Sequence, residues 1–294
     1  MNFYTIVIKL PKQWILVASL TTFIFPGEWV IVDTSLTFST SISIDIARAE
    51  TLNLCRKTAI QRVVPTTLEL YSHFFRNQVE TNEYYKDETA LSSFVISANS
   101  GYLLDESVQY GTPVFEINHS SFDYKMSLKA FVEPVTGERD HSLGVDVWAD
   151  DVNLESETEI NLHIKSKKNG FIYIFWFYAD NSVALLFPND YSNENQIKIG
   201  TTLDVPTARE RSNGLSYHVK LLPGLKLSTE TIYVVFSLKD IENISELISI
   251  GTNQNAGSTG EGSYTDFQKW LSKIPLSLRV ETAIQISISE RQSK

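Results

Sequence analysis

The stretch Asn169-Gly-Phe-Ile-Tyr-Ile-Phe-Trp-Phe-Tyr-Ala-Asp-Asn-Ser-Val-Ala-Leu-Leu-Phe-Pro-Asn189 decides the fold of the carboxyl-terminal half of the chain. Its two apolar runs flank Asp180-Asn181, a pair suited to a tight turn because Asn adopts a positive φ at low cost. This pattern predicts a β-hairpin. Both alternating sets of side chains in the first run are apolar, so we expect a central strand, or one that is covered on its outer side.

Short alternating runs surround this hairpin from residue 143 onward, at the spacing of an antiparallel β-sandwich. They cover residues 143–148, 159–166, 170–179, 182–188, 196–199, 215–222 and 231–237. A Gly/Asn/Ser/Thr-rich loop at 251–263, a short helix at 266–271 and a closing strand at 276–289 complete the expected order. We therefore predict an all-β sandwich over residues 143–294, preceded by a turn-rich linker at 134–142.

The amino-terminal half combines alternation with helical spacing. Residues 34–44 alternate in polarity and predict a strand, and Asp45 is a suitable N-cap for the helix that follows. Pro65 is expected to kink or restart this helix. The remaining segments are helical at 67–79 and 90–98 and alternating at 109–118 and 123–132. The order β-α-α-β-β predicts an α+β domain over residues 34–133, with helices packed on a small sheet.

Residues 1–33 are expected to form a signal or anchor segment. Lys9 and Lys12 precede an uncharged, mostly apolar run at 14–25, which is the layout of a secretory signal. Pro26 and Gly27 end the run, which makes it short for a membrane-spanning helix of about 20 residues. A cleaved signal, a retained anchor and a start codon placed too early remain open, with export as the expectation.

The composition excludes several classes of function. Lys and Arg total 25 against 35 Asp and Glu, which gives a formal charge of −10. Such an acidic chain repels phosphate backbones, so nucleic-acid binding is not expected. The single cysteine, Cys55, excludes a disulfide framework and a multi-cysteine zinc site. We expect Cys55 to be a small buried residue of a helix.

No side-chain pattern indicates a catalytic or metal site. Ser258 lies in a glycine-rich stretch whose spacing is wrong for a nucleophile elbow. The histidines lack the spacing of metal ligands on one element; they are His73, His119, His141, His163 and His218. For a carboxylate cluster, a solvated acidic edge is favoured over a calcium site; its members are Asp146, Asp150, Asp151, Glu155, Glu157 and Glu159. We expect no enzymatic activity, no metal and no cofactor.

The carboxyl-terminal half resembles a bacterial domain of unknown function that occurs behind caspase-like and kinase modules and in exported proteins. The motif residues that carry the resemblance are Gly170, Phe171, Tyr173, Leu186, Phe187, Pro188 and Asn189. A later Gly-Thr step at Gly200 and Thr201, and a strand ending at Pro206, also fit. The resemblance covers about 145–288. It implies an immunoglobulin-like sandwich and carries over no catalytic residue.

The amino-terminal half resembles, over shorter motifs, the amino-terminal domain of flagellar assembly protein T and related exported lipoproteins. The matching features are the Ala/Arg-rich stretch that begins at Ala47-Arg48-Ala49-Glu50 and the strand at 124–132. The chain lacks the lipid-attachment cysteine, which puts direct membrane anchoring in doubt. Together the two resemblances imply a bacterial envelope protein that is periplasmic or associated with the outer membrane.

Three hypotheses of function follow. The first is a non-enzymatic accessory or assembly protein that acts through contacts with envelope proteins or with copies of itself, in a surface machine such as a flagellar or secretion assembly. The second is a carbohydrate- or peptidoglycan-binding module, whose binding residues would be Trp176, Tyr178, Asp180 and Asp190, provided that the aromatic rings are exposed beside the carboxylates. The third is an enzyme with an unrecognised site.

Overall fold

The computed structural model describes residues 27–64, 100–115, 120–221, 225–241, 244 and 261–291, together with two short strands at 6–9 and 15–18. The helical segments expected at 67–79 and 90–98, and nearly all of the loop expected at 251–263, lie outside these residues. The two short strands, β1 (Ile6–Lys9) and β2 (Ile15–Ala18), pair as an antiparallel hairpin. No helix in the described part of the chain has the length and apolar character needed to cross a membrane.

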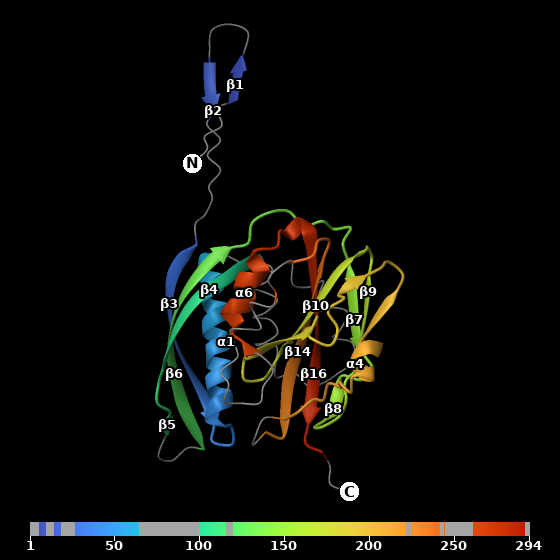
Figure 1. Cartoon of the computed structure of the whole chain (residues 1–294). Coiled ribbons are helices and arrows are strands. Elements are labelled where there is room, and N and C mark those ends of the chain that lie inside the picture. Colours follow the sequence, from blue (N-terminus) through green and yellow to red (C-terminus); the bar gives the residue numbers. More distant parts are fainter. Residues whose placement is uncertain are drawn as a thin grey trace.

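An antiparallel sheet with the order β3-β6-β4 forms one side of the molecule (Figure 1). Its strands are β3 (Glu28–Ser39), β6 (Ser121–Pro134) and β4 (Gly101–Tyr110), and the short β5 (Val114–Phe115) also pairs with β6. Helix α1 (Ile44–Val63) packs on one face of this sheet. The helix is capped by the Ser43 side chain, which accepts a hydrogen bond from Ile46 N, so the N-cap precedes the predicted Asp45.

Two boundaries in this half differ from the prediction. Strand β3 pairs with β6 from Glu28 onward, so 28–33 belong to the sheet and not to the signal or anchor segment. The strand predicted at 109–118 begins earlier, because β4 runs from Gly101 to Tyr110. Its alternation is hidden in the sequence by a register shift between Leu103 and Asp105, where the extra residue turns the later side chains to the opposite faces.

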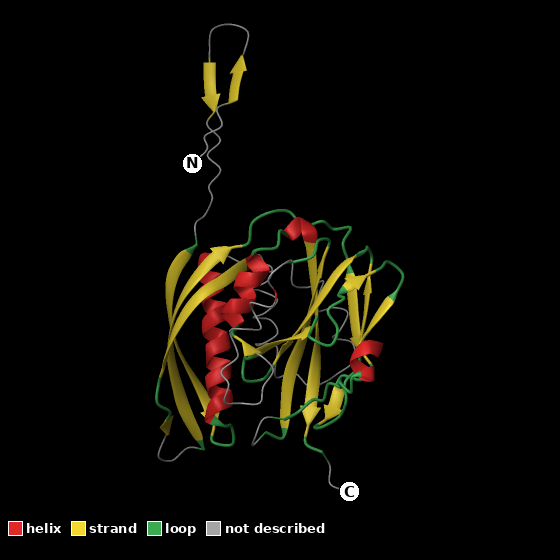
Figure 2. Cartoon of the chain, viewed as in Figure 1, coloured by secondary structure: helices red, strands yellow, loops and turns green. Residues whose placement is uncertain are grey.

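The carboxyl-terminal half contains two sheets that face each other as a β-sandwich and are antiparallel except for the pairing of β16 with β8 (Figures 1 and 2). The smaller sheet has the order β13-β9-β7 and consists of β13 (Thr202–Val205), β9 (Leu162–Ser166) and β7 (Val145–Ala149). The larger sheet has the order β15-β11-β10-β14-β16-β8, with β12 paired to β10. Its strands are β15 (Glu261–Gly262), β11 (Val183–Phe187), β10 (Gly170–Phe177), β14 (Leu227–Ser237), β16 (Arg279–Ser289), β8 (Asn153–Glu155) and β12 (Gln196–Ile197).

The predicted hairpin is confirmed, since β10 and β11 pair and Asn181 has a φ of 70° in the turn. The strand predicted at 215–222 is wrong, because His218 forms only an isolated bridge to Glu159. The short helix is α6 (Tyr264–Ser272), which has a capping box at Ser263. Helix α4 (Ala208–Ser212) and the 3-10 turn η2 (Leu276–Leu278) were not predicted.

Strand β10 is covered on both faces, as the sequence indicated. Ile172, Ile174 and Trp176 pack between the two sandwich sheets. On the opposite face, the Phe175 ring centroid lies 4.8 Å from that of Phe267 and 4.9 Å from that of Trp270, both in α6. The element that covers this face is therefore helix α6.

The core beneath α6 is continuous with the core of the amino-terminal sheet. One cluster of buried side chains includes Leu128 of β6, Ile60 of α1 and Phe267 of α6. The layers are thus the β3-β6-β4 sheet, the two helices, the larger sandwich sheet and the smaller one (Figures 1 and 2). The segment at 134–142, predicted as a linker, joins two halves that share a hydrophobic core.

Candidate interaction surface

The predicted glycan-binding residues do not form an exposed platform. Trp176 is only 3% exposed, and its Nε1 donates a hydrogen bond to Glu230 Oε2 at 2.6 Å. Its ring stacks on half-buried Tyr178 at 5.7 Å between centroids. Asp180 is exposed but accepts hydrogen bonds from Ser182 N and Oγ in the hairpin turn. The prediction for Trp176 fails because both faces of β10 are packed. Asp190 is exposed, but the buried Trp176 ring cannot contact a sugar beside it.

The Leu186-Phe187-Pro188-Asn189 motif is a structural anchor. Asn189 Nδ2 donates to Leu186 O at 2.7 Å and to Glu210 Oε1 at 2.5 Å. The fully buried Glu210 also accepts from Tyr217 Oη at 2.7 Å and from Thr207 N at 2.5 Å. Burial, followed by the hydrogen bond to Glu210, raises the pKa of Tyr217. The motif thus ties the end of β11 to the cap of α4, because each buried polar group finds its partner there.

The other motif residues are also accounted for by packing. A Cβ added to Gly170 would lie 2.4 Å from Ser237 O, so only glycine fits beside β14 at this point. Tyr173 Oη donates to Asp240 Oδ1 at 2.7 Å. Phe171 is partly buried and packs against the core.

Two buried arginine–glutamate pairs lie where the two halves of the chain meet. Arg279 is fully buried and donates to Ile274 O at 2.6 Å, to Leu271 O and to Tyr102 Oη of β4. It also pairs with Glu281, with Nε 2.5 Å from Oε1. A second pair, Arg56 Nε and Glu106 Oε2, is 2.9 Å apart, and the Arg56 guanidinium lies 4.6 Å from the Tyr264 ring centroid. Arg279 is satisfied by Glu281, Tyr102 and backbone carbonyls, whereas the buried Nη1 of Arg56 has no hydrogen-bond partner among the described residues.

Among the described residues, the histidines and carboxylates singled out in the sequence are not grouped as metal ligands. His163 Nδ1 lies 2.7 Å from Asp204 Oδ1, and its Nε2 lies 2.9 Å from Asp150 Oδ1. Of the other acids, Glu159 pairs with Arg211 at 3.0 Å. In the part of the chain that is described, no three His, Cys, Asp or Glu side chains are grouped to hold a metal ion. His73, His119 and Ser258 lie outside that part.

Two of the exposed apolar side chains lie close together on the face of the β3-β6-β4 sheet that is turned away from α1, here called the outer face. Trp29 and Ile31 of β3 are 49% and 58% exposed. The Trp29 ring centroid is 5.5 Å from that of Phe131 on β6, and Lys129 Nζ lies 4.7 Å from the Trp29 ring centroid. Exposed apolar groups gathered in this way are typical of interaction surfaces.

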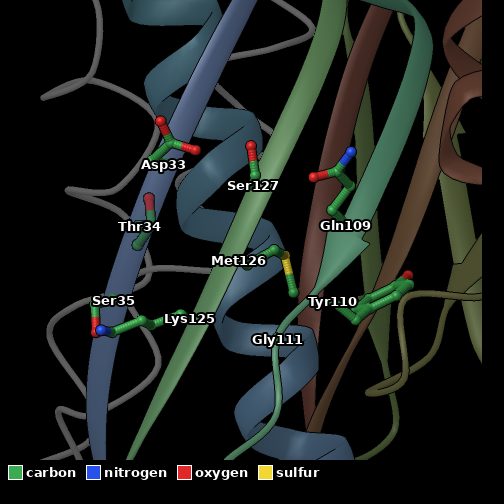
Figure 3. A pocket seen from close by; sticks show the side chains of 9 residues that line it. All are labelled: Asp33, Thr34, Ser35, Gln109, Tyr110, Gly111, Lys125, Met126 and Ser127. Atoms are coloured by element: carbon green, nitrogen blue, oxygen red, sulfur yellow. The ribbon is translucent and has the colours of Figure 1, made fainter.

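A hollow of about 490 Å³ continues the outer face toward the other end of the strands (Figure 3). Figure 3 shows that Asp33, Ser127 and Gln109 come from three adjacent strands, β3, β6 and β4. Ser35 and Lys125 lie one step further along. Among the described residues, none of these five side chains forms a hydrogen bond or an ion pair, so all five are free to contact a partner.

One part of the chain matches a known family. Residues 153–239 match the model of a family described as a domain of unknown function (DUF4384). The matched part runs from β8 to just beyond β14 and includes the Asn189–Glu210 anchor. The carboxyl-terminal half therefore contains a bacterial domain of unknown function. No curated protein matches the chain.

Sequence reasoning missed the outer face because it assigned 28–33 to a signal or anchor segment. The alternation that marks β3 begins in that stretch: Val30 and Val32 face inward, whereas Trp29 and Ile31 face outward. The alternation of polar and apolar residues, followed from Glu28 and not from Thr34, would have indicated the surface.

Proposed function

We propose that this protein is a non-enzymatic accessory or assembly protein of the bacterial cell envelope, and that it acts through protein–protein contacts on the outer face. The observation that carries the proposal is the exposure of Trp29 and Ile31 side by side on a strand whose inward residues are buried. Aromatic and apolar anchors of this kind supply most of the binding energy in protein interfaces. By contrast, the polar clusters of the sandwich are occupied by internal hydrogen bonds.

The proposal extends to compartment and architecture. The apolar run at 14–25 ends shortly before β3 and supports export to the periplasm or association with the outer membrane. We also propose that the sandwich is immunoglobulin-like and that the amino-terminal half is an α+β domain of the order β-α-α-β-β. A flagellar or secretion machine is the proposed setting, with envelope proteins or further copies of the chain as partners.

The test is to isolate the native complex from the envelope fraction of cells that produce the full chain. The double variant Trp29→Glu, Ile31→Lys should lose its partners, because it places charges in the centre of the outer face. Ile199→Lys is the matched control, since Ile199 is 60% exposed and lies in the sandwich. Equal partner recovery from both variants, or a protein that remains in the cytoplasm, would contradict the proposal.

Carbohydrate or peptidoglycan binding is the second candidate, now placed at the outer face and not at Trp176. It is favoured by the free polar side chains of the hollow, on the same face as exposed Trp29 and half-buried Phe131. A pull-down with purified peptidoglycan separates the two candidates. Retention that Gln109→Ala abolishes would support glycan binding, whereas absence of retention would leave the protein-contact proposal alone.

A further inference from the structure

Strand β3 forms an edge of its sheet, and its backbone directions can be assigned. Thr40 N donates to Ser120 O on the β6 side, whereas Ile31 O accepts from the Arg62 guanidinium on the other side. Because successive residues of a strand direct their N–H and C=O groups to opposite sides, even-numbered residues of β3 bond to β6. The odd-numbered residues 29, 31, 33, 35 and 37 therefore direct their backbone groups to the edge. No strand pairs with this edge in the described part of the chain.

Several other sheet edges of the described structure are short, charged or covered. Strands β8 and β15 are only 3 and 2 residues long. The edges of the smaller sheet, β7 and β13, are short and carry outward Asp146 and Asp204. Strand β4 contains a register shift and lies against α6. Each of these devices discourages the addition of a strand.

Strand β3 has almost none of these protections. It extends over 12 residues without proline and pairs with β6 in unbroken register. Its outward side chains include the exposed Trp29 and Ile31. Arg62 occupies a single carbonyl of the edge. A long, regular and partly apolar edge of this kind is a template for β-augmentation, in which backbone hydrogen bonds give affinity and side chains give specificity.

The side chains of β3 indicate what chemistry the added strand should have. Trp29 and Ile31 favour apolar neighbours at one end, Asp33 is acidic at the centre, and Ser35 is polar beyond it. A second copy of β3 paired antiparallel about its centre would place two Asp33 carboxylates opposite each other, which is unfavourable. Charge complementarity instead favours a basic residue opposite Asp33. The chain's formal charge of −10 also favours a basic partner.

We infer that β3 accepts, as an additional strand, an extended peptide segment of a partner protein that carries apolar residues at one end and a Lys or Arg opposite Asp33. This inference rests on the proposed function and specifies how the partner binds. Trp29 and Ile31 anchor the apolar end of the segment, and the odd-numbered backbone groups of β3 hold its main chain.

Amide hydrogen exchange of the full chain, read residue by residue by NMR, tests the inference. In the free protein the amides of 29, 31, 33, 35 and 37 should exchange faster than those of the intervening even-numbered residues. The probe is a short peptide of alternating valine and threonine with lysine at its centre. It should slow the odd-numbered amides, and should bind roughly 3- to 30-fold more tightly than the same peptide with glutamate at its centre.

Two variants keep the test decisive. Asp33→Lys should reverse the preference, so that the glutamate peptide binds more tightly. Ser35→Pro should abolish binding, because it removes an edge-facing N–H without removing a bond to β6, and Ser35→Thr is its matched control. Odd-numbered amides that are protected in the free protein, or a lysine peptide that protects none of them, would overturn the inference. If the Trp29→Glu, Ile31→Lys variant still loses its envelope partner in that case, the proposed function stands without it.

Discussion

Replacing Glu230 by glutamine should stabilise the protein above pH 7. Glu230 is 2% exposed and lies between the sandwich sheets beside Trp176. Burial raises its pKa from 4.5 to about 7, although the Trp176 hydrogen bond acts in the opposite direction. The folded state therefore holds a proton more tightly than the unfolded state. The favourable contribution is fully present below pH 4.5 and is lost as pH rises through about 7.

The size of the effect follows from the displacement of the pKa. A change of one pKa unit corresponds to about 1.4 kcal/mol, so the rise from 4.5 to about 7 sets an upper bound of about 3 kcal/mol. Glutamine is neutral at every pH and keeps an oxygen that can accept from Trp176 Nε1. Above pH 8, Glu230→Gln should thus raise the melting temperature by several degrees, roughly 5–10 °C.

Urea unfolding at pH 5 and pH 8, followed by circular dichroism, measures this difference. The wild-type free energy of unfolding should fall more between the two pH values than that of Glu230→Gln. The exposed Glu155→Gln is the control and should leave the wild-type pH dependence unchanged. A variant that is destabilised equally at both pH values would refute the reasoning, because it would show that Glu230 is charged in the folded state throughout.

Three further predictions concern the packing and the polar clusters. Phe267→Ala should lower the free energy of unfolding by about 3–5 kcal/mol, because Phe267 packs on Phe175 within a core shared by both halves. Urea should unfold the variant in one transition, and two separate transitions would contradict the shared core. Asn189→Ala should cost about 1–3 kcal/mol, because it removes one of the hydrogen-bond donors to buried Glu210 and leaves the other two in place; the melting temperature reports this loss. The hydrogen bond with Asp204, and then that with Asp150, raises the pKa of His163 above 6.5. An NMR titration should therefore find the midpoint of His163 above pH 6.5. The favourable contribution of protonated His163 to stability should be lost as pH rises through that midpoint.

The hairpin could be predicted because its information is local. Asp180-Asn181 specifies the turn, and the apolar faces of the run at 170–177 require burial on both sides. The helix at 266–271 was likewise predictable from its own residues, and is observed as α6. That α6 covers β10 was not predictable, because this contact depends on how segments far apart in the sequence pack together.

The candidate surface could not be predicted for a related reason. Trp29 and Ile31 closely follow the apolar run at 14–25, so in the sequence these outward-facing residues of an edge strand look like the end of a signal segment. Only the pairing of Glu28 with Val132 shows that the strand begins there. The opposite error was made at Trp176, where a residue type common in binding sites is held in the core by Glu230.

Photo-crosslinking from position 31 in living cells tests the central proposal most directly. A photoreactive phenylalanine analogue replaces Ile31 in the full chain, and the same analogue at position 199 serves as the control, since Ile31 and Ile199 are 58% and 60% exposed. The outer face should give a discrete adduct with an envelope protein from position 31 and none from position 199. Adducts from position 199 alone, or from neither position in cells that assemble the native complex, would contradict the proposal that the outer face is the interaction surface.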